Sequence, residues 1–196
     1  MKFTPTPLAG SYEIEMMPLG DDRGHFMRTF CANEFRDAGL ASDFVQASVS
    51  RNSEKGTVRA LHFQAHPRME DRLVRCLSGS IFDVAVDLRP GSPTFGQWHS
   101  IILSEENHLQ FFIPKGFAHG FQTLTDNCVV SYQMTEFFDP SLTQGVFWND
   151  PEVAIKWPLP PTNQSPRDLD LPNFADIDHA ILMPFDIAKS AGDKEV

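Results

Sequence analysis

Histidines, carboxylates and arginines cluster in one short stretch of the chain, residues 59–75, which reads RALHFQAHPRMEDRLVR. His62 and His66 stand in a largely apolar run that leads into Glu-Asp-Arg at 70–72. Imidazole and carboxylate groups can hold a metal ion or move a proton, and arginines can bind an anion. The stretch is therefore the first candidate for a functional site, with simple decoration of a sheet rim as the alternative.

A metal site is the first possibility. Metal-binding barrels of the cupin type carry the motif G-x5-H-x-H-x3,4-E-x6-G, followed later by P-x-G-x2-H. Pro114, Gly116 and His119 match the second part, but Gln64 stands in place of the second histidine and Arg72 in place of the carboxylate. Because arginine stays cationic, it cannot ligate a divalent ion. The sequence therefore predicts no metal.

A proton-transfer site fits the same residues better. Alternation along a strand would place His62 and Gln64 on one face, and Arg72 would arrive from the next strand. A neutral histidine can remove a proton beside a carbonyl while a cation stabilises the enolate oxygen. Tyr132, on the apolar face of 127–135, could act as the acid. The alternative is that the histidine and the tyrosine are ordinary structural residues.

A sheet-rich fold must position these side chains. From residue 44 to 148 short strand patterns alternate with Gly and Pro turns, and 31–40 predicts a short helix ended by Gly39. Residues 80–88 alternate, with Phe82, Val84, Val86 and Leu88 on one face and Asp83 and Asp87 on the other. Many short strands favour a closed double sheet, because closure removes exposed edges. We expect an all-β, antiparallel jelly-roll barrel with short flanking helices.

The length bounds the domain organisation. A chain of 196 residues can bury one good core but is short for two domains, so 1–196 is predicted to be a single domain with its jelly-roll core at about 44–148. After Trp157 the composition turns to Pro and Asp, which predicts a C-terminal extension over the barrel mouth, at 157–196.

The charge balance limits the partners. The formal net charge is −10, whereas binding nucleic acid or an anionic membrane requires clustered cations, so neither is expected. A local group of arginines could still bind an anionic small ligand: Arg59, Arg68, Arg72 and Arg75. The sequence contains no apolar run typical of a signal peptide or membrane span and no C-x-x-C pair, which predicts a cytoplasmic protein with free thiols.

Taken together, several segments resemble the dTDP-4-dehydrorhamnose 3,5-epimerase family, from about residue 20 to about 172. They are DDRGHF, FVQASVS, RALHFQ, RLVRCLSGSIFDVAVDLRPGSPTFGQW, LSEENHLQFFIPKGFAHGF, SYQMTEFFDP, FWNDPEVAIKWP and SPRD. The resemblance implies a metal-free cupin jelly roll that forms a homodimer by exchange of its N-terminal segment. It also implies an isomerase that makes dTDP-4-dehydro-L-rhamnose, a nucleotide sugar for cell-surface polysaccharides, from dTDP-4-dehydro-6-deoxy-D-glucose and that needs no cofactor.

The resemblance implies roles for individual residues. His62 corresponds to the family's catalytic base in a dyad with Asp168, Tyr132 to its general acid, and Arg72 to a lysine that steadies the enolate oxygen. Further residues correspond to positions that bind the diphosphate, sugar or base: Arg23, Gln46, Ser48, Arg59, His119, Phe138 and Arg167. Because alternation separates Arg59 from His62, a bulge between them is required if both reach the ligand.

Several positions depart from the family pattern. The usual Glu, Asn and Tyr around the nucleobase are Arg28, Ser48 and Phe138, and the usual Gly, Gln and Lys are Ala60, Glu70 and Arg72. The nucleobase, which could also be that of a CDP- or GDP-sugar, therefore stays open, as does epimerisation at C3, C5 or both. A keto-isomerase on the same barrel, a non-catalytic sugar-nucleotide binding module and, last, a metal-dependent cupin are the competing hypotheses.

Overall fold

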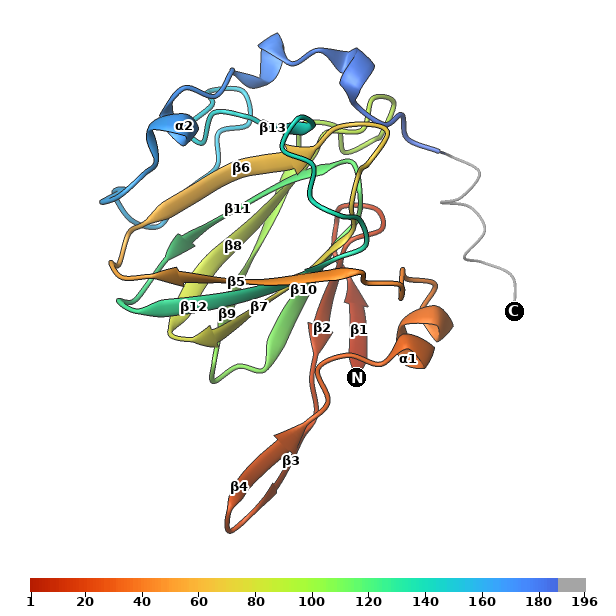
Figure 1. Cartoon of the computed structure of the whole chain (residues 1–196), viewed down its shortest axis with the longest axis vertical. Coiled ribbons are helices and arrows are strands. Elements are labelled where there is room, and N and C mark those ends of the chain that lie inside the picture. The colour runs from red at the N-terminus through yellow and green to blue at the C-terminus, as the bar shows by residue number, and fades with distance from the viewer. Residues whose placement is uncertain (187–196) are drawn as a thin grey trace.

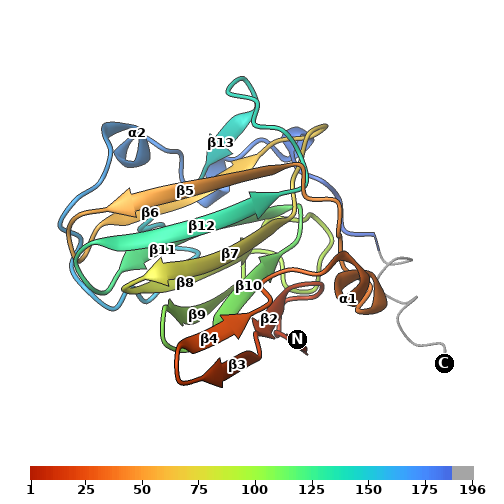
Figure 2. The same ribbon diagram turned by 60° about the horizontal axis from the view of Figure 1, so that its bottom comes forward.

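The computed structural model describes residues 1–186, in which two antiparallel sheets face each other (Figure 1). Figure 2 shows the first sheet, whose strand order is β1 (Lys2–Pro5), β2 (Tyr12–Glu15), β10 (Leu109–Ile113), β7 (Arg72–Ser78), β12 (Cys128–Met134) and β5 (Gln46–Asn52). The second has the order β13 (Thr143–Gly145), β6 (Val58–Gln64), β11 (Phe117–Thr123), β8 (Ser80–Asp87) and β9 (Trp98–Ser104). The predicted all-β jelly-roll architecture is confirmed.

Strand β8 is buried on both of its faces. Ile81 and Ala85 belong to the core between the two sheets, whereas Phe82 and its apolar neighbours at alternate positions belong to a second core outside the barrel. The C-terminal extension covers this outer core, and the rings of Phe82 and Trp157 lie 5.7 Å apart. The predicted alternation is therefore present, but its aspartate face is the one turned toward the barrel interior.

The N-terminal strands and the helices complete the fold. β1 and β2 lie outside the predicted core of 44–148, yet β2 pairs with β10 and so extends the first sheet. The predicted short helix is α1 (Ala32–Asp37), and Gly39 follows it with a φ of +73°, a conformation that favours glycine. The extension contains α2 (Pro166–Leu169), η1 (Phe174–Asp176) and η2 (His179–Ile181). The part of the predicted extension beyond residue 186 lies outside the described residues.

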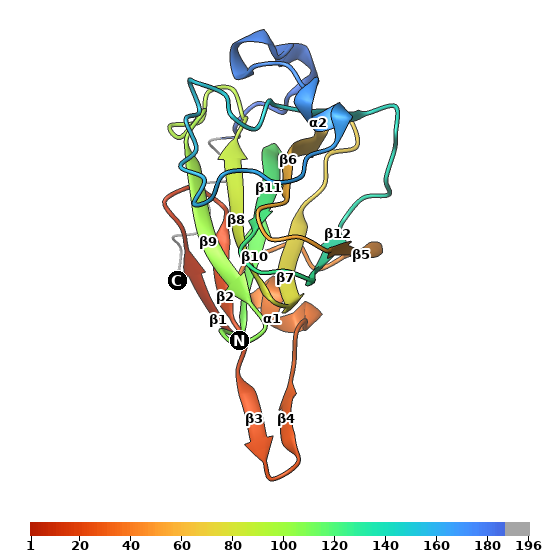
Figure 3. The ribbon, with the colours of Figure 1, turned by 90° about the vertical axis from the view of Figure 1, so that its left-hand side faces the viewer.

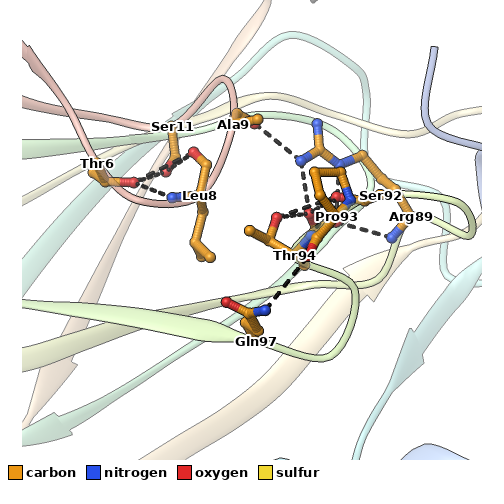
Figure 4. A network of polar contacts seen from close by, with 10 residues as sticks. Thr6, Leu8, Ala9, Ser11, Arg89, Ser92, Pro93, Thr94 and Gln97 are labelled. Atoms are coloured by element: carbon orange, nitrogen blue, oxygen red, sulfur yellow. Dashed lines mark hydrogen bonds and ion pairs between the residues drawn. The ribbon is translucent and has the colours of Figure 1, made fainter. Parts of the chain in front are cut away.

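A buried polar network joins the end of β8 to the N-terminal loop (Figure 4). The Asp87 carboxylate accepts hydrogen bonds from Arg89, Ser92 and Thr94, and Arg89 also donates to the Ala9 carbonyl at 2.9 Å. Burial raises the pKa of Asp87, but these donors outweigh that effect and hold the pKa below its usual value. The network therefore depends on an ionised carboxylate.

A hairpin of β3 (Pro18–Asp21) and β4 (Gly24–Met27) projects from the barrel (Figure 3). Leu19 and Phe26 on this hairpin are both 72% exposed, which is unusual for large apolar side chains. Within residues 1–186, no helix is long and apolar enough to cross a membrane.

Candidate active site

A cavity of about 380 Å³ opens between the two sheets. Most of the residues predicted for the site line it, together with three that were not predicted. The lining residues are Gln46, Ser48, Arg59, His62, Glu70, Arg72, His119, Phe121, Tyr132, Met134 and Phe138.

A β-bulge brings Arg59 and His62 to the same cavity. His62 pairs with His119 and Arg59 pairs with Phe121, so three steps along β6 oppose two along β11. The bulge that the sequence required is therefore present. Gly120 permits it, because a Cβ at this position would lie 2.5 Å from the Cβ of Ala60. Ala60 is fully buried, so its side chain packs against β11 and does not line the cavity.

His62 is held by an aspartate from the C-terminal extension. Its Nε2 lies 2.9 Å from Oδ1 of Asp168 in α2, a helix that Ser165 caps through its hydroxyl. Burial raises the pKa of Asp168, but hydrogen bonds from His62, from Ser165 and from the backbone of Ala60 hold the pKa below the ordinary value. The carboxylate is thus ionised at neutral pH and orients the imidazole.

Arg72 faces His62 from the other sheet. Arg72 was expected to come from the next strand and to share the wall of His62. It does lie on the next strand of the chain, but β7 pairs with β10 and β12, whereas β6 belongs to the opposite wall. Its Nη1 donates to the His62 carbonyl at 2.9 Å and its Nε donates to Oε1 of Glu70 at 2.8 Å, while Nη2 forms an ion pair with the same oxygen at 2.6 Å. The cation therefore spans the space between the walls.

Gln64 does not line the cavity, contrary to the expectation that it shares the wall with His62. Its side chain is buried, its amide nitrogen donates to the carbonyls of Arg68 and Phe137, and its oxygen accepts from the Asp139 N–H. The amide therefore ties the loop between β6 and β7 to the segment after β12. Gln64 is therefore a structural residue.

Residues of β5 and β12 complete the first-sheet wall. Tyr132 lies opposite Ser48 on β5, and both line the cavity. Phe138, at the cavity mouth, is 59% exposed, and its backbone N–H donates to Oε1 of Gln46 at 2.8 Å. An exposed aromatic ring on a cavity rim offers a face on which a planar ligand group can stack.

A second histidine–aspartate pair lies on the second-sheet wall. Nε2 of His119 is 2.8 Å from Oδ1 of Asp83, whose side chain is fully buried. Burial raises the pKa of Asp83, although His119 and Arg72 act in the opposite direction. Nearby, Nε of Arg59 donates to Oδ1 of Asn52 at 2.7 Å.

Two predicted binding residues do not line the cavity. Arg23 lies in the turn of the β3–β4 hairpin, where it pairs with Asp21, and Arg167 is exposed on α2. Three lining residues escaped prediction, namely Glu70, Phe121 and Met134. The alternation of 127–135 could have indicated Met134, since it shares a face with Tyr132. Glu70 was noted only as the residue in place of the family's usual Gln, and no role in the site was predicted for it.

The cavity carries the groups needed to move a proton. A histidine oriented by a carboxylate can act as a base, a tyrosine as an acid and an arginine as a partner for a developing oxyanion. Within residues 1–186, no three His, Cys, Asp or Glu side chains lie close enough together to hold a metal ion. A jelly-roll barrel built in this way for proton transfer falls in the class of cupin-type isomerases.

Comparison with known proteins identifies the family within this class of isomerases. Residues 5–176 match the family model described as dTDP-4-dehydrorhamnose 3,5-epimerase, a longer stretch than the predicted 20–172. The enzyme of that name from Methanothermobacter thermautotrophicus is 47% identical over 158 residues, which cover 81% of this chain and 84% of that protein. The chain belongs to the dTDP-4-dehydrorhamnose 3,5-epimerase family.

Solved structures agree with this assignment. The dTDP-6-deoxy-D-glucose-3,5-epimerase from Legionella pneumophila, in complex with dTDP-4-keto-L-rhamnose, has a TM-score of 0.90 and 40% identity, covering 94% of this chain and 98% of that chain. A 3'-monoepimerase from Streptomyces bikiniensis, in complex with dTDP-quinovose, has a TM-score of 0.85 and 27% identity, covering 97% of this chain and 96% of that chain.

Proposed function

We propose that the chain epimerises C3 and C5 of dTDP-4-dehydro-6-deoxy-D-glucose and so forms dTDP-4-dehydro-L-rhamnose. The observation that carries this proposal is the placement of His62 and Tyr132 on opposite sheets around one cavity. Inversion of a carbon requires a proton to leave one face of the sugar ring and to return on the other. A base and an acid on facing walls meet that requirement.

His62 removes the proton. With the Nε2 proton donated to Asp168, the lone pair of Nδ1 is left to accept a proton from the substrate. C3 and C5 both adjoin the C4 ketone, so loss of a proton from either carbon gives an enolate. The ionised Asp168 stabilises the imidazolium that forms.

Arg72 and Tyr132 complete each inversion. The guanidinium stabilises the negative charge on the C4 oxygen, a contribution of about 10² to 10³ in rate for a single well-placed donor. The Tyr132 hydroxyl then donates its proton to the carbon from the opposite face. The phenolate recovers a proton from solvent and the His62 imidazolium releases one to solvent, which restores both groups for the next inversion. The reaction is redox-neutral, so its balance requires no electron carrier.

Binding of the nucleotide draws on the remaining residues. Arg59, beside His62, and His119 supply donors for the diphosphate and sugar, and Phe138 offers its ring to the base. We also propose a homodimer in the cytoplasm. The exposed apolar side chains of the β3–β4 hairpin support the dimer, because a second copy would cover them and would receive Arg23 beside its own cavity.

The fate of the substrate protons tests this function. The wild-type protein, incubated with the dTDP keto sugar in D₂O, is expected to introduce deuterium at C3 and C5 with inverted configuration, as read by NMR. Absence of deuterium at both carbons with the dTDP, CDP and GDP forms would refute the proposal. Retention of the C5 configuration together with movement of the ketone from C4 to C3 would instead identify a keto-isomerase.

A mono-epimerase is the second candidate, because residues at positions that contact the nucleobase in the family pattern are different in this chain. Arg28, Ser48 and Phe138 differ from the family pattern, and the Streptomyces bikiniensis monoepimerase shares the fold. Deuterium at C3 alone would identify this activity. A thermal-shift series with the nucleoside diphosphates identifies the base, because the preferred nucleotide raises the apparent stability most.

A further inference from the structure

Glu70 is the charged cavity residue to which the proposed mechanism assigns no role. Its side chain is only 10% exposed and that of Arg72 only 15%, so the pair is largely withdrawn from solvent. Nε of Arg72 donates to Oε1 of Glu70, and Nη2 forms an ion pair with the same oxygen at 2.6 Å. Charge-assisted bonds of this kind, made in a half-buried site, hold a guanidinium in one plane.

Two hydrogen bonds and one ion-pair contact together define the orientation of the Arg72 guanidinium. Glu70 takes the N–H of Nε and lies 2.6 Å from Nη2, and the His62 carbonyl takes an N–H from Nη1. A guanidinium has five N–H donors, so at least one N–H on each terminal nitrogen is left for a ligand. The bond to the His62 carbonyl links these two donors to the strand that carries the base.

The pair also sets which cation this position accepts. An ammonium group is a compact point charge without the planar fork of arginine, so a lysine here could not satisfy Glu70, the His62 carbonyl and a substrate oxygen in one plane. The Glu70 carboxylate would draw it away from the substrate. Glutamine has nearly the same shape as glutamate but no charge, and so would leave the ammonium free.

We propose that Glu70 is a positioning residue that aims Arg72 at the C4 oxygen and makes the site specific for arginine at this position. The inference rests on the proposed function, since it assigns the direction of the cation in that reaction. Glu70 and Arg72 then act as a unit: glutamate at position 70 requires arginine at position 72, whereas glutamine at position 70 would permit lysine.

A double-mutant cycle tests the coupling. With Glu70 present, R72K is expected to lower kcat about 100-fold. E70Q alone should lower kcat less than about fivefold, because glutamine can still accept one N–H. The E70Q/R72K variant should regain about tenfold in kcat over R72K.

The same substitutions in the more exposed Arg68–Glu136 pair, R68K and E136Q, form the control and should show no coupling. A double variant as slow as, or slower than, the product of the single effects would overturn the proposal.

An NMR measurement tests the positioning without turnover. In the wild-type protein the Arg72 Nε–H signal, assigned by its loss in R72K, should exchange with solvent about tenfold more slowly than in E70A. Equal exchange rates would overturn the proposal. If the wild type exchanges no substrate proton, the proposed function fails, whereas this experiment still decides whether Glu70 orients Arg72.

Discussion

Among single residues, His62 is expected to have the largest effect on kcat. H62A removes the base, so kcat should fall by about 10³-fold, within the range for general acid–base catalysis. Affinity for dTDP, measured by calorimetry, should change little. H66A is the matched control, because His66 is exposed and does not line the cavity, and its kcat should equal that of the wild type. Unchanged turnover in H62A would show that a different group removes the proton.

Asp168 should matter through its charge. D168N keeps the shape of the side chain but removes the carboxylate that stabilises the imidazolium, and it allows the amide to select the wrong tautomer of His62. We expect kcat to fall about 100-fold with little change in KM, as for other residues that orient a functional histidine. Steady-state kinetics on the purified variant measure both constants. A D168N enzyme with wild-type kcat would show that the contact is only structural.

The predictability of the site differs from residue to residue. Residue types in strands indicated His62, Arg72 and Tyr132, but family resemblance alone supplied Asp168, because 106 residues separate it from His62 and no spacing signal covers that distance. Gln64 and Arg72 were expected on the wall of His62. The loop between β6 and β7 crosses from one sheet to the other, which alternation within a strand cannot reveal.

At the scale of the element, Gly120 is the residue on which the β6 bulge depends. G120A would force its Cβ against Ala60 and the Arg59 carbonyl, at 2.5 and 2.9 Å, and should destabilise the fold by about 2 kcal/mol. Urea denaturation measures the change. A60G/G120A removes one of these clashes and should recover part of the loss. Equal stability of G120A and the wild type would contradict the close approach of β6 and β11.

Asp87 makes the end of β8 sensitive to acid. Its folded-state pKa is lowered, so its contribution to stability is complete above the pKa of an unfolded aspartate, about 3.9, and is lost as the pH falls through the folded value. D87N should cost about 3 kcal/mol at pH 7, since it leaves Arg89 without a buried counter-charge. Below pH 4 the free energy of unfolding of D87N should depend less on pH than that of the wild type. Parallel curves of unfolding free energy against pH for the two proteins would exclude this role.

Strand β8 also shows what a sequence pattern leaves undetermined. The alternation of Phe82 and Val84 with Asp83 is correctly predicted, and the usual inference would turn the apolar face inward. Both faces are buried here, because the C-terminal extension covers the apolar one while Asp83 meets His119 beside the cavity. Periodicity identifies the faces of a strand, but the tertiary partners decide which face is the interior.

At the scale of the whole molecule, the β3–β4 hairpin predicts self-association. L19E/F26E places two charges on its exposed apolar side chains and should convert a dimer into a monomer, as measured by light scattering. I102E, on the exposed part of β9, is the control and should stay dimeric. If Arg23 reaches the partner's cavity, the monomeric variant should also bind dTDP more weakly. A wild-type monomer would contradict the predicted homodimer.

In the proposed mechanism the second sheet removes the proton through His62, and the first sheet returns it through Tyr132. Y132F keeps the base of one sheet and removes the acid of the other, so the enolate should form but accept its proton only from the side of His62. The most direct test is NMR of the keto sugar incubated with Y132F in D₂O. We predict deuterium at C5 with the original configuration retained. Inverted product at the wild-type rate, or no deuterium at C5, would contradict catalysis from opposite walls.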